Sequence, residues 1–286
     1  MPTSTLPRVS LIVSAPESQD ALDLAFATIE RQTCPPIEVV VADHSDDNQI
    51  AQSVSKWSAR FAFDVQCVRD PKQSRSRAPV LNRALRAATG DYVVFVDGDC
   101  LLNPHFIEDH QRHARVQIFL QGCRAGVRAR YVRRLSAEKF RPMTWFLRRR
   151  IYGLRQGLRL PWAIITQNDH EAIHGYNFAV WRKDLLRVNG FDEAFDESGR
   201  EMAELAERLR NAGLTLHTIT GQAVVYHLDH RRIAHYHTQT SERILERTRR
   251  EKIIRCEQGL SSDEATPAAP SNSSSHPHVA PPAHAG

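Results

Sequence analysis

Two carboxylates, Asp97 and Asp99, stand one residue apart at the end of an apolar run in the middle of the chain. The run, Tyr92 to Val96, is rich in β-branched and aromatic residues, which is typical of a buried strand. Open α/β sheets bind ligands at the carboxyl ends of their strands. Two hard oxygen donors at such an end suit Mg²⁺ or Mn²⁺, whose remaining positions suit phosphate oxygens. The alternative is an ordinary polar turn, because Asp-Gly is common in turns.

The part of the chain before this motif alternates between apolar strands and amphipathic helices. In the first predicted helix, Leu22, Ala25, Phe26 and Ile29 share one face. This β-α-β-α-β-α-β order predicts an α/β fold with a mostly parallel central sheet covered by helices on both faces. The expected strands are 9–14, 37–42, 63–68 and 92–96, and the expected helices are 20–32, 50–59 and 75–88.

After residue 100 the alternation is less regular, although one later helix is strongly amphipathic. That helix, 201–211, carries Leu205 and Leu209 on one face and has Gly213 as its C-cap. From Gly259 onward the chain is largely Ser, Pro, Ala and His, which cannot bury enough apolar surface to fold. The other expected helices are 104–113, 184–188 and 241–256, and the other expected strands are 116–123, 125–132, 175–181, 214–219 and 223–226.

Composition narrows the class of protein. Of the 286 residues, 41% are hydrophobic and 25% are charged, an ordinary balance for a soluble globular protein. The net charge of +5 suits a nucleic acid, an anionic lipid or a phosphate-bearing substrate. Five cysteines without Cys-x-x-Cys spacing argue against a zinc knuckle or a redox dithiol, and their odd number favours a reducing compartment. The sequence shows neither the pattern of a signal peptide nor an apolar run of about 20 residues, the length of a spanning helix.

Residues 135–157 combine many arginines with bulky apolar side chains. One interpretation is a solvated basic helix that packs through its aromatic side. The other is a surface for anionic lipid headgroups or for an acidic acceptor. Aromatics among arginines also suit single-stranded nucleic acid, but the sequence contains no known nucleic-acid-binding module, so we expect no nucleic-acid partner.

Three motifs occur in a fixed order along the chain. They are a strand–helix–strand start that ends in Asp43, the strand that ends in Asp97-Gly98-Asp99, and a long series that runs through Gly175-Tyr176-Asn177, Asn189-Gly190-Phe191-Asp192-Glu193, Gly199-Arg200-Glu201 and His227-Leu228-Asp229-His230. Over about residues 8–232 this pattern resembles family 2 glycosyltransferases with a GT-A fold, and it is most similar to bacterial members with a galactosyltransferase-like C-terminal region. The resemblance implies transfer of a sugar from a nucleotide-diphosphate sugar to a glycan or glycolipid acceptor, with inversion of the anomeric centre.

The resemblance implies a set of residues that bind the nucleotide sugar. Asp43, at the end of the second strand, would contact the nucleotide base, and Asp97 would contact the ribose. Gly175 and Asn177 would line the cleft for donor and acceptor. Uridine is the commonest base in the family, so the expected donor is a UDP-sugar.

The resemblance also implies a metal site. Asp99 would hold Mn²⁺ or Mg²⁺, and His227 or His230 would complete the site. Such a cation neutralises the leaving diphosphate, while a carboxylate on the opposite side takes the proton of the acceptor hydroxyl. Each histidine could instead be an ordinary hydrogen-bonded side chain.

Several segments depart from the family pattern. Ala15-Pro16-Glu17 replaces the usual Thr-Tyr-Asn, and Asp43-His44-Ser45-Asp46 replaces the usual Asp-Asp-Gly-Ser. Where the family has Trp-Gly-x-Glu-Asp, Ser198 falls on the acceptor-stacking tryptophan and Met202 on the catalytic base, which leaves Glu201 as the candidate base. Two functions therefore stay open: a metal-dependent inverting glycosyltransferase with Glu201 or another group as base, or a catalytically impaired homologue that binds a sugar nucleotide or a partner glycosyltransferase.

The sequence thus predicts one GT-A domain with two appendages. Residues 1–100 would bind the nucleotide sugar, and residues 101–235 would supply the acceptor and metal side. A charged helix (236–258) and a disordered tail (259–286) would follow. We expect a role in polysaccharide biosynthesis and a cytoplasmic location, with peripheral contact to the inner face of the membrane through residues 135–157.

Overall fold

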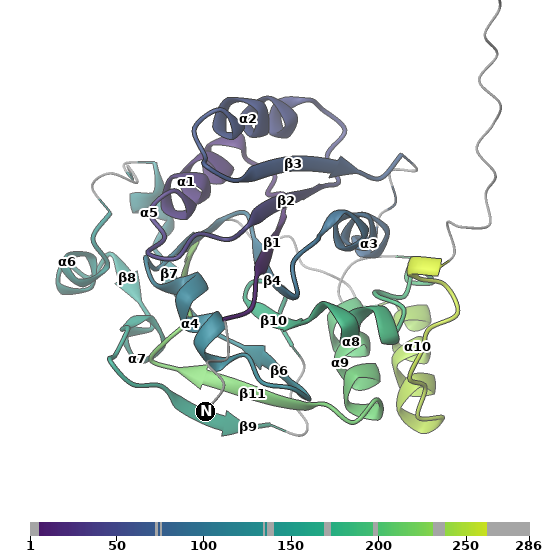
Figure 1. The fold of residues 1–286 in the computed structure, drawn as a ribbon. Coiled ribbons are helices and arrows are strands. Elements are labelled where there is room, and N and C mark those ends of the chain that lie inside the picture. The colour runs from purple at the N-terminus through teal and green to yellow at the C-terminus, as the bar shows by residue number, and fades with distance from the viewer. Residues whose placement is uncertain are drawn as a thin grey trace, which may run out of the picture.

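An eight-stranded sheet forms the centre of the computed structural model, which describes residues 6–71, 74, 76–133, 135, 140–168, 173–196, 200–230 and 238–261 (Figure 1). In spatial order this sheet contains β3 (Asp64–Arg69), β2 (Glu38–Asp43), β1 (Val9–Ser14), β4 (Tyr92–Asp97), β10 (Phe178–Trp181), β6 (Ile118–Gln121), β11 (Thr215–Thr220) and β9 (Ile164–Gln167). A second sheet contains β5 (Cys100–Leu102), β12 (Val224–Leu228), β7 (Cys123–Val127) and β8 (Ile151–Tyr152).

The strands β3, β2, β1 and β4 are parallel, and helices cover both faces of this half of the sheet (Figure 1). On one face α1 (Gln19–Ile29) and α2 (Gln49–Ser58) pack on the strands, with Phe26 fully buried. On the other face α3 (Ala78–Ala87) packs through Leu85. Successive strand residues point to opposite faces, so a strand that is covered on both sides must be apolar throughout. The predicted α/β architecture is confirmed, and the first seven expected elements lie within three residues of the observed ones.

The other half of the large sheet is mixed. β10 is antiparallel to β4 and β6, β11 is parallel to β6, and β9 is antiparallel to β11. The strand predicted over 175–181 is wrong for its first three residues, because Asn177 N donates to His174 O and closes a turn there. The strand predicted over 125–132 ends at Val127, and α5 (Ala129–Val132) follows it.

The interpretation of residues 135–157 as one basic helix is wrong for the part of this stretch that the structure describes. Two short helices, α6 (Pro142–Leu147) and α7 (Leu154–Gly157), flank β8 instead. Between them Arg149 and Gly153 have φ angles of 53° and 78°, which a right-handed helix cannot contain. The aromatic packing that was expected does occur, since the ring of Phe140 contacts Trp145 and also Tyr226 of β12.

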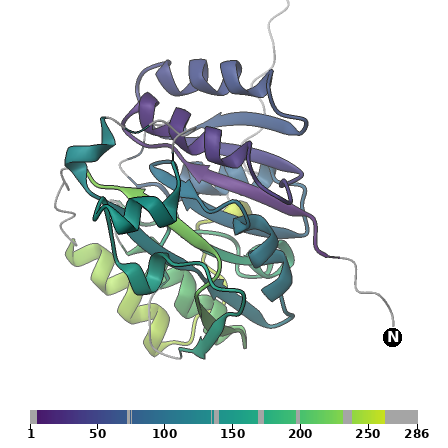
Figure 2. The same cartoon turned by 90° about the vertical axis from the view of Figure 1, so that its left-hand side faces the viewer.

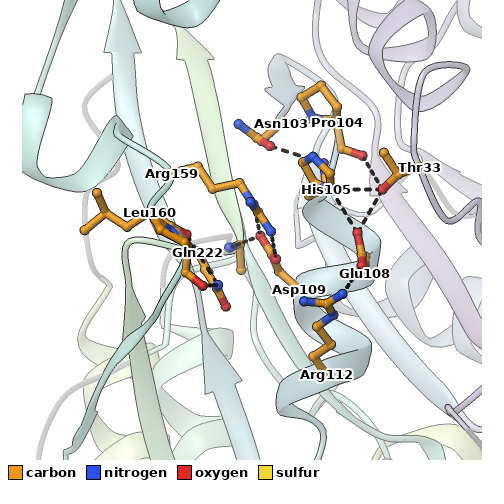
Figure 3. Close-up of polar contacts among 12 residues, drawn as sticks. Thr33, Asn103, Pro104, His105, Glu108, Asp109, Arg112, Arg159, Leu160 and Gln222 are labelled. Carbon is orange, nitrogen blue, oxygen red and sulfur yellow. Dashed lines mark hydrogen bonds and ion pairs between the residues drawn. The ribbon is translucent and has the colours of Figure 1, made fainter.

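Helix α4 (Phe106–His113) anchors the connection between α7 and β9. The carboxylate of Asp109 is buried and accepts two hydrogen bonds from Arg159, at 2.7 and 2.9 Å (Figure 3). Gln222, in the turn before β12, donates to the carbonyl oxygen of Leu160 (Figure 3). A buried bidentate pair of this kind fixes both partners in orientation, so the end of the arginine-rich stretch has a defined position.

Another residue of α4, His110, is buried against Asn177. His110 Nε2 lies 2.9 Å from Asn177 Oδ1, while Asn177 Nδ2 donates to the carbonyl oxygens of Cys123 and Ala223. Because Nδ2 is the donor atom, Oδ1 must accept, and His110 is therefore the neutral tautomer with its proton on Nε2. The pair fixes the turn before β10 to α4 and β7.

The predicted amphipathic helix is α9 (Glu201–Asn211), and α10 (Gln239–Arg250) packs against it (Figure 1). Arg208 and Glu204 form an ion pair of 2.7 Å with side chains only 0% and 1% exposed. Thr248 of α10 donates to Glu204 at 3.0 Å. Since both charges are neutralised and hydrogen-bonded, they can be buried in the contact between the two helices.

The residues after α10 return to the body of the protein near α8 (Arg182–Arg187). Leu260 N donates to Asn189 O, Ser261 N donates to Asn189 Oδ1, and Arg86 donates to Leu260 O. The prediction of disorder from Gly259 onward is therefore wrong for residues 259–261, and residues 262–286 lie outside the described residues. Among the helices that the structure describes, none has the length and apolar character needed to cross a membrane.

Replacement of Arg208 by alanine should destabilise the protein strongly. It would leave Glu204 buried without its partner, which costs about 3 kcal/mol or more of unfolding free energy. Arg249→Ala is the matched control, because Arg249 pairs with Glu207 at 3.0 Å but is half exposed. We expect the control to lose about 1 kcal/mol at most in urea titrations. Equal losses in the two variants would contradict this account of the helix contact.

The pH dependence of stability should report on His110. Burial lowers the pKa of His110 to about 4, whereas histidine in an unfolded chain titrates near 6.5. Between these values the unfolded chain binds a proton that the folded protein does not, so acid favours unfolding. The unfolding free energy should fall by up to about 3 kcal/mol as the pH drops from 6.5 to 4. Urea titrations of wild type and His110→Gln should show this extra slope in wild type alone, and an identical slope in both would refute the assignment.

Candidate functional site

The site forms at the carboxyl edge of the parallel strands, where β1, β2 and β4 end. Asp97 is the last residue of β4 and pairs with Ser14, the last residue of β1. Gly98 N then donates to Ser14 O at 2.8 Å. A Cβ atom at position 98 would lie 2.6 Å from Cδ of Pro16, so only glycine fits between the two carboxylates. The loop after β1 and the Asp97–Asp99 turn are therefore in direct contact.

The structure brings Asp99 together with both late histidines. His227 Nε2 lies 3.3 Å and His230 Nε2 lies 3.0 Å from Asp99 Oδ2. One ligand atom from each of the three residues lies within 4.8 Å of the others. Strand pairing explains the convergence, because β12 pairs with β5 so that His227 lies opposite Cys100, next to Asp99.

Asp229 and Tyr152 lie behind this cluster, which we call the Asp99–His227–His230 cluster. His227 Nδ1 faces Asp229 Oδ1 at 4.0 Å, and Tyr152 of β8 donates to the same oxygen at 2.7 Å. The Tyr152 ring lies over Gly126, where a Cβ atom would be only 2.1 Å from it. Hydrogen-bonded carboxylates beside metal-ligating histidines are a common orienting device in metal sites.

Arg77 joins the two other carboxylates of the site. It lies 3.6 Å from Asp97 and 3.1 Å from Glu201, whose side chain is 0% exposed. Met202 is also buried, and its Cε is 3.0 Å from the position of a Cβ built on Gly175. That Cβ would lie 3.8 Å from both Asp97 and Arg77, so Gly175 leaves space in the middle of the site.

The two carboxylates of the Asp-Gly-Asp motif have different electrostatic surroundings. Burial raises the pKa of Asp97 against the opposing effect of Arg77, and the neighbouring charge of Asp99 raises it further. For Asp99 burial also acts upward, but the hydrogen bond from His227 and the charges of His227 and His230 bring its pKa below the usual value. The two neighbouring carboxylates therefore have pKa values shifted in opposite directions.

Asp43 and Asn177 are less accessible than the other predicted site residues. The Asp43 carboxylate is 0% exposed, accepts from Arg69 Nε at 2.7 Å and accepts from both the backbone and the hydroxyl of Ser45. The Asn177 amide is buried in its contacts with His110, Cys123 and Ala223. In this structure both side chains shape the loops around the site and present no exposed surface to a ligand. Ser198 lies outside the described residues.

Two arginines near the site were not among the predicted residues. Arg77 lies just before α3, and Arg124 of β7 stacks over the ring of Tyr176 at 4.7 Å and is close enough to Asp97 to lower its pKa. No local pattern in the sequence marks either position. Cations beside carboxylates at this edge would also favour a bound anion such as a diphosphate.

Known glycosyltransferases resemble this chain in sequence. Residues 10–173 match the glycosyl transferase family 2, and residues 164–231 match a family described as the N-terminal domain of galactosyltransferase. Validoxylamine A glucosyltransferase of Streptomyces hygroscopicus subsp. limoneus is 26% identical over 230 residues, which cover 75% of this chain and 50% of the relative. Chondroitin synthase of Escherichia coli is 24% identical over 238 residues, 77% of this chain and 34% of the synthase. The chain thus spans about half or less of the length of these relatives.

Solved structures show the same fold. The Pyrobaculum calidifontis mannosyltransferase PcManGT, in complex with GDP-Man and Mn²⁺, superposes with a TM-score of 0.54 at 22% identity over 78% of this chain and 57% of its own. Residues 1–349 of S. aureus TarS, in complex with UDP-GlcNAc, give a TM-score of 0.62 at 15% identity over 89% of this chain and 68% of TarS. The family match covers more than half of the sequence, and the chain therefore belongs to the glycosyl transferase family 2, with a GT-A fold.

Proposed function

We propose that the protein is a metal-dependent inverting glycosyltransferase that uses a nucleotide-diphosphate sugar. The observation that carries the proposal is the Asp99–His227–His230 cluster at the carboxyl edge of the sheet. Asp97 and Arg77 lie directly beside it. A structural polar turn would not need two histidines, 128 and 131 positions later, to converge on one carboxylate oxygen.

The donor set of the cluster fits a divalent cation. Asp99 would supply one oxygen and His227 and His230 one imidazole nitrogen each, and Asp229 and Tyr152 would hold His227 in orientation. Two imidazole nitrogens favour Mn²⁺ over Mg²⁺, which prefers oxygen ligands. When bound, the cation would stabilise the charge that develops on the leaving diphosphate.

The donor would bind beside this cluster along the edge formed by β1, β2 and β4. PcManGT and TarS were solved with GDP-Man and UDP-GlcNAc, so their shared fold supports a nucleotide sugar as ligand. Asp97 and Gly175 would contact the donor. Asp43 and Asn177 are buried, and they would contribute by fixing the conformation of the adjoining loops. A UDP-sugar remains the donor that we favour.

Glu201 is the proposed general base. Arg77 holds its carboxylate in an ion pair that occupies the oxygen that would accept the proton. A diphosphate bound next to Arg77 would compete for the same guanidinium. Donor binding would then free Glu201 to take the proton of an acceptor hydroxyl.

Two features of the site favour a second function. The apolar side chain of Met202 lies beside Gly175 where the family carries a carboxylate, and Glu201 is buried. Both features suit a catalytically impaired homologue that binds a sugar nucleotide or a partner glycosyltransferase. Transfer without a general base would be slower by about 10²–10⁴-fold.

The acceptor would be a glycan or a lipid-linked glycan in polysaccharide biosynthesis. The proposed location is the cytoplasm, at the inner face of the membrane. All five cysteines lie in the described residues and none is paired in a disulfide, which supports a reducing compartment.

Asp99→Ala should abolish Mn²⁺-dependent donor binding while the protein stays folded. Saturating UDP-glucose, UDP-GlcNAc or GDP-mannose with Mn²⁺ should raise the melting temperature of wild type by several degrees, since ligand at a hundredfold excess over Kd stabilises by about 2.7 kcal/mol. The variant should show no such shift. Asp91→Ala is the control, because Asp91 is a half-exposed carboxylate paired only with Arg8 among the described residues. A full Mn²⁺-dependent shift in Asp99→Ala would mean that the motif is a turn and not a metal site.

Met202→Asp tests the base. We expect transfer to rise tenfold or more, because the substitution would place a carboxylate beside Gly175 in the middle of the site. Stability should fall by about 2 kcal/mol, because position 202 is buried. Met202→Asn should show the loss of stability without the gain in rate. Slower transfer by Met202→Asp than by wild type would contradict the expected role of this position. Donor binding without transfer by all three proteins would instead support the impaired homologue.

A further inference from the structure

One side of the molecule is strongly basic. We call it the basic face and define it as the exposed surface of residues 128–133 and 141–156, which contains α5, α6, β8 and α7. These elements lie along the left-hand side of Figure 1, and Figure 2 turns this side toward the viewer. From residue 110 to residue 168 the sequence contains a single acidic residue, Glu138, which lies outside the described residues.

Most arginines of the basic face are exposed to solvent. Among the described residues, none of six exposed arginines forms an ion pair: Arg128, Arg130, Arg133, Arg148, Arg149 and Arg155. Helix α10 is equally rich in arginine but differs in this respect, since Arg247 and Arg250 both pair with Glu251. The positive charge of the basic face is therefore available to an external anion.

Apolar side chains stand exposed among these arginines. Met143 and Leu147 lie one helical turn apart on α6 and are 55% and 77% exposed, and Leu154 at the start of α7 is 57% exposed. Trp145, by contrast, points inward and is buried against Phe140. Helix α6 therefore buries Trp145 in the protein and presents Met143 and Leu147 to solvent. Exposed apolar side chains among basic residues are typical of a surface that enters a lipid headgroup layer.

A cavity next to α6 extends this surface. It has a volume of about 290 Å³ and reaches α6 at Pro142. Its walls combine apolar side chains with two guanidinium groups, and they are formed by Thr28, Arg31, Leu102, Pro104, Phe140, Arg141 and Pro142. An apolar recess with cationic groups suits an amphiphilic anion better than a fully hydrated one.

The basic face is fixed relative to the candidate site. The Arg159–Asp109 pair anchors one end of it, and Phe140 packs on Tyr226 of β12 at the other. In the middle, Tyr152 donates to Asp229, the residue that faces His227. Only one residue therefore separates the basic face from the Asp99–His227–His230 cluster.

We propose that the basic face docks the protein onto an anionic lipid bilayer, with the Asp99–His227–His230 cluster at the rim of the contact. Docking would place the cluster next to the headgroup layer, so the acceptor of the proposed transferase would be carried on a membrane lipid. The statement about the acceptor rests on the proposed function, whereas the statement about docking does not.

The chemistry of the face favours a bilayer over a nucleic acid. Single strands bind to exposed aromatic rings that stack on bases, in addition to basic groups. Among the aromatic residues of the basic face Trp145 is buried and only Tyr152 is exposed, at 41%. The more exposed apolar groups, Met143, Leu147 and Leu154, are aliphatic. Aliphatic groups between arginines match acyl chains beneath anionic headgroups.

Flotation with lipid vesicles tests the proposal on the full chain. Wild type should bind vesicles of phosphatidylcholine with 30% phosphatidylglycerol, in about 0.15 M salt, and should not bind vesicles of phosphatidylcholine alone. Arg148→Glu combined with Arg155→Glu should weaken binding tenfold or more, because each basic residue near an anionic surface contributes roughly fivefold. Leu147→Ser should weaken it several-fold, and this loss should persist at higher salt.

A matched control separates the basic face from net charge. Arg243→Glu combined with Arg250→Glu changes the charge equally but on α10, and it should bind within twofold of wild type. Equal losses in the two double variants, or equal binding of wild type to neutral and anionic vesicles, would overturn the proposal. Binding to single-stranded DNA as tight as to anionic vesicles would also overturn it. Asp99→Ala should bind vesicles like wild type, so failure of the metal site and failure of docking are distinguishable.

Discussion

The pairing of β12 with β5 is the contact on which the candidate site depends. It places His227 opposite Cys100, and Leu228 N also donates to Asp99 O at 2.9 Å. Asp99 is therefore held from two sides, by the β4 strand that precedes it and by a strand from the far end of the domain. The glycine at position 98 permits this arrangement because the loop after β1 leaves no room for a side chain there. Rigid strands that meet at one edge give the cluster its precision.

Every carboxylate discussed at this edge contacts an arginine or a histidine. Asp97 and Glu201 share Arg77, Asp43 is matched by Arg69, and Asp99 is matched by two histidines. Each pair satisfies a carboxylate that would otherwise be costly to bury. The same pairs limit what the site can do without a ligand, since the cations that would bind a diphosphate are already engaged. The basic face differs, because six of its exposed arginines form no ion pair with any described residue.

The sequence predicted the parallel half of the fold because that half is built from local signals. Apolar runs and amphipathic helices follow one another there, and the Asp97–Asp99 motif ends one of the runs. The features it could not predict depend on distant contacts or on unusual backbone. Arg149 has a positive φ angle although it is not a glycine, so nothing in the sequence indicates that the helix ends there. A continuous helix was therefore predicted. Glu201 looked like an accessible base, but Arg77, 124 positions earlier, covers it.

The turn at residues 259–261 bears on how the protein unfolds. Segments with few contacts to the rest of a protein usually open first. Here Arg86 of α3 donates to Leu260 O, and Gly190 leaves space for the Leu260 side chain. Fraying at this end would therefore remove contacts from α3 and from the Asn189–Gly190 turn, both of which cover the core. Helix α3 and the turn at residues 259–261 thus belong to one cooperative unit, and this turn should exchange its amide protons only as slowly as that unit opens.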